Sequence, residues 1–169
     1  TQHQRMRAAL NPPFVPRGLS LSGIGSVMSD CIHQRLLKWS RGSSLRILSE
    51  TQSIALEIIF RLLDVKVEEL QAWQDNYRQF MQILIPIKLD FPGSPRRRAL
   101  RARCWLDAQL TALIERSRQA PEGPSLVSAM SHARDEGGQL LSMQELIDNF
   151  RRLILAGHET TACVMAWMV

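Results

Sequence analysis

The chain has 169 residues, 45% of them hydrophobic and 22% charged, which suits one globular domain and excludes a disordered segment. No apolar run approaches the ~18 residues that a membrane-spanning helix requires, and the polar, basic start TQHQRMRAAL is unlike a signal peptide. Three widely separated cysteines, Cys31, Cys104 and Cys163, argue against a disulfide framework and a zinc site, and indicate a reducing compartment.

The first half of the chain predicts a series of helices. Residues 1–10 have the pattern of a helix end, which the segment NPPFVP stops. A second helix is predicted from Gly18 to about Ser40, because apolar residues recur there at helical spacing. The segment RGSS breaks this pattern, and a short apolar piece, LRIL, leads to a third helix through SIALEIIFRLLD.

The next helix is predicted from Glu68 to Leu84, and its apolar stripe has the spacing of a core-facing surface. We predict that the stripe is formed by Leu70, Trp73, Tyr77, Phe80, Met81 and Leu84. The proline-rich segment PIKLDFPGSP that follows predicts a loop. Ser94 as N-cap and Pro95 in the first turn then begin a helix that runs to about Arg118. This helix is predicted to bury Leu106, Leu110 and Leu113.

After the breaker QAPEGPS, a short helix is predicted from Leu126 to Ala133, followed by the turn RDEGGQLLS. Ser142 and Glu145 match a capping box, so the last helix is expected to begin near Met143. No strand alternation and no internal repeat rises above the background. The predicted fold class is therefore all-α.

Arginine supplies nearly all of the net charge of +5, and it clusters in PRRRALRAR between Arg96 and Arg103. A basic patch can bind nucleic acid, acidic lipid or an acidic protein. An ordinary solvated helix face has the same composition. Because the segment has no interleaved aromatic residues and no nucleic-acid motif, we predict no nucleic-acid partner.

The last helix, NFRRLILAGHETTACVMAWMV, is apolar at helical spacing but has polar residues at its centre. A glycine inside a helix costs about 1 kcal/mol relative to alanine, and an unpaired buried carboxylate costs more. The small Ala156 and Gly157 form a notch that a flat group can approach. The Thr160 hydroxyl can bond the Ala156 carbonyl and bend the helix, while Glu159 beside it provides an acid for proton relay.

Other interpretations of this helix are weighed against that one. An ordinary core helix with a packing glycine has the same residues at its centre. The run HETTA begins like the zinc-protease motif His-Glu-x-x-His, but Ala162 stands at the second histidine position. Cys163 follows His158 by five residues and lies on another face, so no metal site is predicted.

The segment LILAGHETTA resembles the oxygen-binding helix of the cytochrome P-450 family, the haem-thiolate monooxygenases. The family pattern is Ala/Gly-Gly-x-Asp/Glu-Thr-Thr/Ser, and the preceding DEGGQLLSMQELIDNF looks like the family's approach to that helix. The residues that match the pattern are Ala156, Gly157, Glu159, Thr160 and Thr161.

A second resemblance lies near the start, where HQRMRAALNPPF is similar to the family's helix that contacts the haem propionates. His3 and Arg7 fall on the two contact positions, and because they are one turn apart they face the same way. Cationic or hydrogen-bonding groups there would neutralise buried propionates. A basic amphipathic helix end is the ordinary alternative. The segment LDFPGSPRRRALRAR and the helix after it look like the family's substrate-access region, so the resemblance covers the whole chain.

The resemblance implies that residues 1–169 are an incomplete, internal portion of a single cytochrome P-450 domain. The chain has no initiator methionine, and VMAWMV stops within an apolar helix. The family's N-terminal part, its later Glu-x-x-Arg helix, its cysteine haem-ligand loop and its small β-sheets would lie outside. The chain would then hold one wall of the haem site and no iron ligand, and the fragment alone is predicted to be inactive.

The resemblance also assigns residue roles. Thr160 and Glu159 would be catalytic, with Thr160 stabilising the iron-bound oxygen species and its water, and Glu159 feeding protons. Leu155 and Arg152 would face the substrate. Contacts with haem or bound O2 would come from His3, Arg7, Ala156, Gly157 and Thr161.

The implied cofactor is haem b (iron protoporphyrin IX), with electrons from NAD(P)H through a ferredoxin or flavoprotein reductase. The implied partners are an apolar small-molecule substrate and O2, the implied location is cytoplasmic, and membrane contact stays open. A different class of function is a non-enzymatic helical binding domain that uses Arg96 to Arg103 for an acidic partner. A third is a degenerate, haem-free relative.

Overall fold

A computed structural model describes residues 2–21, 23–39, 44–84 and 91–168 of the chain. Its α-helices are α1 (Gln2–Leu10), α2 (Pro16–Leu21), α3 (Ile24–Lys38), α4 (Ile47–Leu62), α5 (Leu70–Met81), α6 (Pro95–Gln119), α7 (Leu126–Ser131) and α8 (Met143–Trp167). Three 3-10 helices adjoin them, η1 (Pro12–Phe14), η2 (Val67–Glu69) and η3 (Gln82–Leu84). The described ranges contain no strand, only an isolated bridge between Arg134 and Leu140, so the predicted all-α fold is confirmed.

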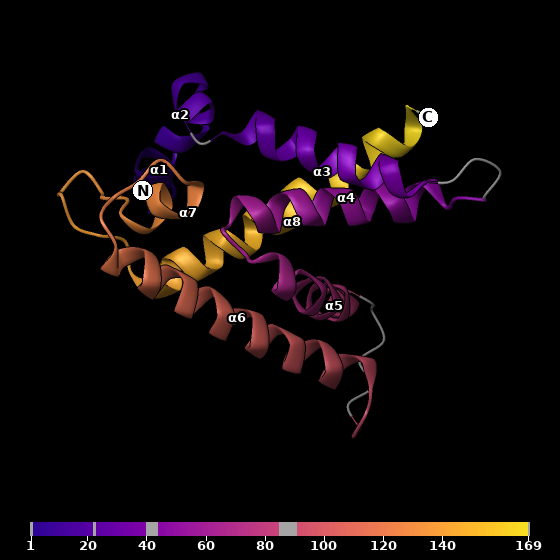
Figure 1. The fold of residues 1–169 in the computed structure, drawn as a ribbon. Coiled ribbons are helices and arrows are strands. Elements are labelled where there is room, and N and C mark those ends of the chain that lie inside the picture. Colours follow the sequence, from indigo (N-terminus) through magenta and orange to yellow (C-terminus); the bar gives the residue numbers. More distant parts are fainter. Residues whose placement is uncertain (1, 22, 40–43, 85–90, 169) are drawn as a thin grey trace.

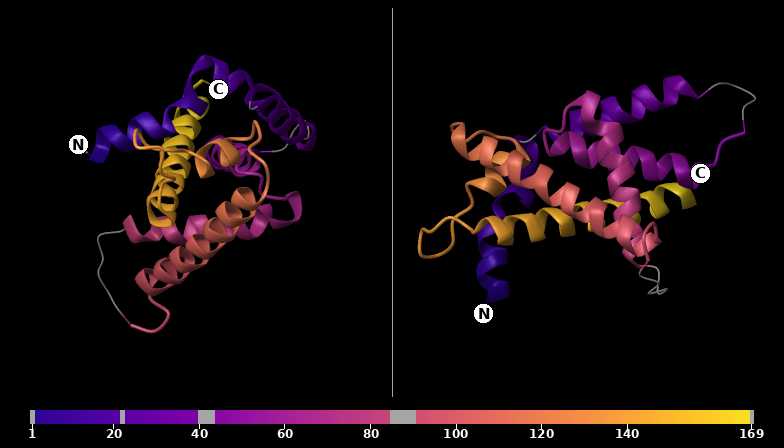
Figure 2. Two further views of the ribbon diagram at one scale, coloured as in Figure 1. Left: turned by 90° about the vertical axis from the view of Figure 1, so that its left-hand side faces the viewer. Right: turned by 90° about the horizontal axis from the view of Figure 1, so that it is seen from below.

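The long helix α8 crosses the middle of the molecule, and the other helices pack around it (Figure 1). Helix α4 lies along α8, and α3 packs on α4. Helices α5 and α6 pack against each other on the side of α4 and α8 that faces away from α3, as two further views show (Figure 2). Helices α1 and α7 gather near the first turns of α8. The fold therefore brings α1 and α8, the two helices that carry the sequence motifs, next to each other.

An aromatic cluster joins α4, α5 and α6. The Phe60 ring lies 5.3 Å from Trp73 and 6.3 Å from Tyr77, measured between ring centroids. Trp73 in turn packs edge-on against Trp105 of α6 at 5.7 Å. Tilted and edge-on ring pairs at these distances are favourable beyond the area that they bury. The cluster holds the three helices together on the side of α8 that faces the core.

Several local predictions are confirmed. The Ser94 hydroxyl accepts a hydrogen bond from the Arg97 backbone N–H at 3.3 Å, and Pro95 is the first residue of α6. Both halves of the capping box at Ser142 and Glu145 are present, and α8 begins at Met143. The side chains predicted to be buried on α6 are buried, namely Leu106, Leu110 and Leu113.

Other predictions about the helices are wrong. The single helix from Gly18 to Ser40 is two helices, because Gly23 adopts a left-handed backbone with φ +64° that ends one and begins the next. Ser40 itself lies outside the described residues. Leu84 does not belong to the core, since α5 ends before it and the side chain is 65% exposed. The short helix predicted near Leu126 to Ala133 is present as α7, which starts at Leu126 and ends at Ser131.

Candidate active site

An open cavity of about 680 Å³ lies between α1 and α8, with η1 and α7 at its edges. Its apolar wall comes from all four elements and consists of Met6, Leu10, Phe14, Met130, Leu153 and Ala156. Arg7 of α1 and Arg152 of α8 add positive charge, while Glu145 and Asp148 add carboxylates near the start of α8. The cavity can therefore take a mainly apolar group that carries charge at one end.

The polar motif lies on a helix that is buried on one face only. Ala156 and Thr160 are exposed on the side of the cavity. Phe150, Ile154 and His158 are buried on the opposite side, where α8 packs on α4. The apolar spacing suggested a buried helix, but only one face of α8 is buried, so the polar residues on the open face need no buried partner within this chain.

Gly157 lies at the contact between α8 and α4. A Cβ atom at this position would sit 3.1 Å from Ile59 Cδ1, closer than most side-chain contacts, and at an ordinary 3.6 Å from Ile59 Cγ1. Ala156, and not Gly157, lines the cavity. The two small residues therefore point to different neighbours, and the structure supports the packing-glycine interpretation for Gly157. A contact of Gly157 with haem or O2 stays a prediction.

Replacing Gly157 with valine should destabilise the protein by about 1–3 kcal/mol, because the added atoms overpack the contact with Ile59. Alanine should be close to neutral, since its better helix propensity of about 1 kcal/mol offsets a tight contact with a flexible side-chain end. Urea unfolding measures both. Gly25→Val is the matched control, because a Cβ on that helical glycine meets nothing within 4 Å. An equal effect of the two valine substitutions would contradict the packing role.

The Thr160 hydroxyl donates a hydrogen bond to the Ala156 carbonyl oxygen, as predicted from the four-residue spacing. This bond uses the hydroxyl proton and leaves the lone pairs of the oxygen available as acceptors on the exposed face of α8. The bond also holds the side chain one turn from the cavity-lining Ala156. Thr161, the next residue, is half-buried.

Glu159 lies at the border between the open and the buried face of α8. Its side chain is half-buried, and Oε1 lies 3.2 Å from Nδ1 of the buried His158. Leu155 is exposed on the open face, but it is not among the residues that line the cavity. The structure thus brings Arg152 and Ala156 to the cavity and leaves Leu155 beside it.

On α1, the predicted pair of contact positions is described only in part. Arg7 is exposed and lines the cavity, and none of the carboxylates in the described residues forms an ion pair with it. His3 is in the same helix, but its side chain lies outside the described part of the chain. Arg152 approaches the cavity from α8. Burial acts to raise the pKa of the neighbouring Asp148, but the hydrogen bonds with Arg151 and Gln144 and then the charges of Arg151 and Arg152 lower it below its ordinary value.

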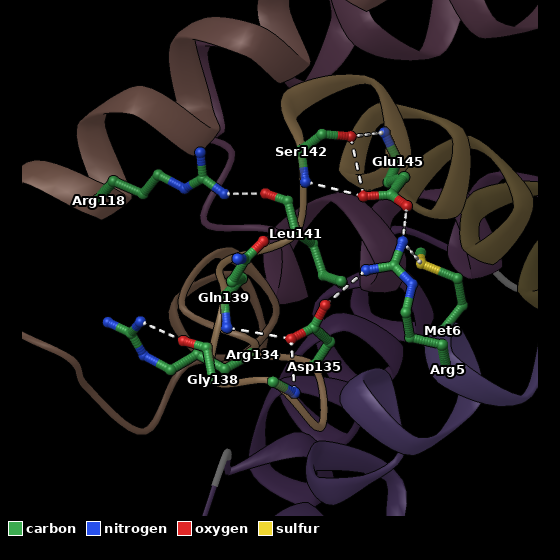
Figure 3. A network of polar contacts seen from close by, with 11 residues as sticks. Arg5, Met6, Arg118, Arg134, Asp135, Gly138, Gln139, Leu141, Ser142 and Glu145 are labelled. Carbon is green, nitrogen blue, oxygen red and sulfur yellow. Dashed lines mark hydrogen bonds and ion pairs between the residues drawn. The ribbon is translucent and has the colours of Figure 1, made fainter. Parts of the chain in front are cut away.

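A polar network that local sequence patterns did not reveal ties α1 to the start of α8 (Figure 3). The Arg5 guanidinium donates to Asp135 Oδ2 at 2.9 Å and also pairs with Glu145 Oε1. Oε2 of Glu145 meanwhile accepts the Ser142 backbone N–H at 2.9 Å. One carboxylate therefore caps α8 and holds α1. Arg118 of α6 joins the same region by donating to the Leu141 carbonyl at 2.6 Å.

The carboxylates that meet at Arg5 both have lowered pKa values. Backbone N–H donation from Gln139 and then the hydrogen bond with Arg5 lower the pKa of Asp135. The backbone N–H and the hydroxyl of Ser142, followed by the charge of Arg5, lower the pKa of Glu145. Because the folded values lie below the unfolded ones, the network stabilises the fold at neutral pH, and this stability is lost as pH falls below about 4.

Arg5→Met should lower stability at pH 7 and reduce the acid-side loss of stability, because the guanidinium part of both pKa shifts disappears. Urea unfolding at pH 7 and at pH 3 measures the difference, which should shrink at the lower pH. Arg134→Met is the matched control. Arg134 adjoins Asp135 in the chain, donates to the Gly138 carbonyl and pairs with no carboxylate among the described residues. Parallel behaviour of the two variants at both pH values would contradict the network's role.

Comparison with known proteins finds a match over nearly the whole chain. A family model described as Cytochrome P450 matches residues 2–169. The chain belongs to the cytochrome P450 family. Cytochromes P450 are haem- and iron-binding monooxygenases.

Curated relatives match almost the whole chain. Cytochrome P450 BJ-4 of Bradyrhizobium diazoefficiens is 36% identical over 167 residues, which cover 99% of this chain and 37% of that protein. Its homolog in Sinorhizobium fredii is 38% identical over the same length, with the same coverage. The chain thus spans little more than a third of the length of these P450 relatives.

Solved P450 structures have the same fold. The retinoic acid-bound cyanobacterial CYP120A1 superposes with a TM-score of 0.83 at 25% identity, over 95% of this chain and 37% of that one. CYP109E1 from Bacillus megaterium, in complex with corticosterone, gives a TM-score of 0.77 at 21% identity, over 95% of this chain and 42% of that one. The second likeness is of the fold alone.

Proposed function

We propose that the chain is part of a haem-dependent monooxygenase that inserts one atom of O2 into an apolar organic substrate. The observation that carries this proposal is the shared wall of α1 and α8, where Arg7 and Ala156 line one cavity. Family membership supports it, and Thr160 stands one turn from Ala156 on the same helix face. Residues 1–169 would form part of a single P450 domain, with the remaining part outside this chain.

The residues of the cavity fit haem b. A porphyrin is flat and apolar, with two carboxylates at one edge. The cavity has an apolar wall and the cation of Arg7, which forms no ion pair within the described residues. Arg7, with His3 one turn earlier, would hold the propionates. Ala156 would let the flat face of the ring approach α8, because its side chain is a single methyl group. The axial cysteine would lie outside residues 1–169.

When bound, thiolate-ligated haem supplies the activation of O2 and the cleavage of the O–O bond. The chain's own residues would position the reacting groups and supply protons to them. Thr160 presents an oxygen acceptor at a fixed place, because its proton is held by the Ala156 carbonyl. Glu159 can hold a proton at the edge of the open face, since its carboxylate is half-buried and not capped by an arginine among the described residues. Apolar side chains around them would exclude bulk water.

The proposed substrate is an apolar organic molecule, as the likeness to P450 relatives suggests. A relative described as taxane 10-beta-hydroxylase, 28% identical over 172 residues, and the retinoic acid-bound CYP120A1 structure support an apolar organic substrate. Leu155 and Arg152 would face it. Electrons would come from NAD(P)H through a ferredoxin or a flavoprotein reductase. The described residues include no helix with the length and apolar character to cross a bilayer.

The test is the difference spectrum of the full-length protein, reduced and then exposed to carbon monoxide. A Soret band shifted well to the red is expected, because it reports a thiolate-ligated haem. If folded protein supplied with haem lacks this band, the proposal fails. The alternative of a binding domain for an acidic partner would then be tested through the salt dependence of binding at the exposed arginines between 96 and 103.

A further inference from the structure

His158 is a buried polar side chain that the proposed mechanism does not use. It is 4% exposed and packs edge-on against Tyr77 of α5, with ring centroids 5.3 Å apart and an interplanar angle of 86°. Neither of its ring nitrogens makes a well-aligned hydrogen bond within the described residues, and the same holds for the buried Tyr77 hydroxyl. Buried polar atoms without aligned partners are rare in native proteins and call for an explanation.

The Glu159 carboxylate lies beside the imidazole. Nδ1 is 3.2 Å from Glu159 Oε1. The backbone of Gln52 on α4 also favours the charged form of the ring, which an acceptor does and a donor does not. A neutral imidazole carries a single N–H and can serve only one of these acceptors, whereas the imidazolium serves both. The protonation of His158 is therefore tied to the charge of Glu159.

The groups around His158 act in opposite directions. Burial lowers the pKa of the imidazole most, the Glu159 carboxylate raises it, the Arg78 guanidinium of α5 lowers it, and the Gln52 backbone of α4 raises it. Tyr77 stays a neutral phenol, because burial and then the charge of Glu159 raise its pKa. Burial is the largest of these influences and the pKa of His158 lies below its ordinary value, so an imidazolium at this position gives up its proton readily.

We propose that His158 and Glu159 share one exchangeable proton between Nδ1 and Oε1, and that His158 is a positioning residue that recharges Glu159 from the buried side of α8. The inference rests on the proposed function of Glu159. The proton leaves Nδ1 with its lone pair staying on nitrogen, and Glu159 becomes a neutral acid. A solvent proton then restores the imidazolium, and no redox change occurs.

The stoichiometry of the proposed reaction calls for such a supply. Each turnover would consume one substrate molecule, O2, two electrons and two protons, and would release the hydroxylated product and one water. Glu159 stands on the border between the cavity side and His158, so protons can enter it from the side that substrate does not occupy. Thr160, the next residue, then presents its oxygen on the open face.

The decisive variant is His158→Phe in the full-length holoenzyme, because phenylalanine keeps the ring and its edge contact with Tyr77 but has no nitrogen. We expect product formed per reductant consumed to fall several-fold, and the pH dependence of this ratio between pH 5 and 8 to flatten. The thermal midpoint and the carbon monoxide spectrum check that fold and haem are kept. An unchanged ratio and pH profile in folded variant would overturn the inference.

Glu159→Gln separates the inference from the proposed function. If Glu159→Gln stays fully coupled, the proposed proton role of Glu159 fails, and this inference fails with it. If Glu159→Gln uncouples the enzyme and His158→Phe does not, only the role of His158 fails.

A second readout does not depend on turnover. The ¹⁵N NMR signals of the His158 ring can be followed against pH in the diamagnetic ferrous carbon monoxide form, with His158→Phe used for assignment. Glu159→Gln should move the titration midpoint of His158 to lower pH, because the carboxylate that raises its pKa is gone. A midpoint that does not move would overturn the shared proton.

Discussion

Thr160→Ala should uncouple the holoenzyme, so that reductant is consumed and hydrogen peroxide is released while product per reductant falls about tenfold or more. The hydroxyl that donates to the Ala156 carbonyl is lost, and with it the acceptor oxygen one turn from the cavity wall. The haem spectrum should be unchanged, because Thr160 is exposed and its replacement by alanine removes no contact on the buried face of α8. Parallel measurement of reductant, peroxide and product gives the ratio.

Thr111→Ala is a matched control for this variant. Thr111 of α6 makes the same kind of bond, from its hydroxyl to the Asp107 carbonyl four residues back at 2.8 Å, and it does not line the cavity. It should leave coupling unchanged. Thr160→Ser should also stay coupled, because it keeps the hydroxyl. A fully coupled Thr160→Ala, or equal uncoupling in both alanine variants, would remove Thr160 from the proposed mechanism.

Local chemistry made the helix starts predictable from the sequence. An N-cap serine before a proline and a Ser-x-x-Glu capping box act within one turn, so Ser94 and Ser142 mark the first residues of α6 and α8 without any tertiary information. The hydrogen bond from Thr160 to Ala156 is of the same kind, because its two partners are four residues apart on one helix. Caps and hydrogen bonds between residues of one helical turn can therefore be predicted from the sequence of that turn.

Tertiary contacts set the features that the sequence left open. Apolar spacing predicted α8 but did not tell which face meets α4, and Gly157 acquires its neighbour only through Ile59, nearly a hundred residues earlier. The pairing of Arg5 with Glu145 spans 140 residues, and no local pattern links them. The capping box predicts the contact between Glu145 and Ser142, but nothing in the sequence indicates that the other carboxylate oxygen of Glu145 pairs with Arg5. The break at Gly23 was missed because apolar spacing continues across it.

The two faces of α8 explain why the motif could look like a core helix. Residues such as Phe150 and Ile154 fill the core against α4, and they impose apolar helical spacing on the whole segment. Ala156, Glu159 and Thr160 lie on or beside the other face, where an apolar and catalytic environment would come from a cofactor and substrate. One helix thus serves packing and the proposed chemistry with residues that alternate along the same sequence.

Arg7→Leu should weaken haem retention about tenfold or more, because a charge-assisted hydrogen bond to a carboxylate would be replaced by an apolar group. Arg7 lines the cavity and has no carboxylate partner in the described part of the chain, so its charge is available for a ligand. The rate at which haem passes from the holoenzyme to an excess of apomyoglobin measures the effect. Thermal unfolding of the haem-free protein checks that the variant keeps its fold.

Arg96→Leu and Arg7→Lys make this prediction specific. Arg96→Leu removes the same charge and adds the same side chain on the exposed face of α6, away from the cavity lining, and should leave haem retention unchanged. Arg7→Lys should keep part of the retention, because it keeps the charge but loses the planar, two-pronged geometry. If both leucine variants lose haem equally, net charge and not the Arg7 contact governs retention. If Arg7→Leu loses none, α1 does not hold the propionates.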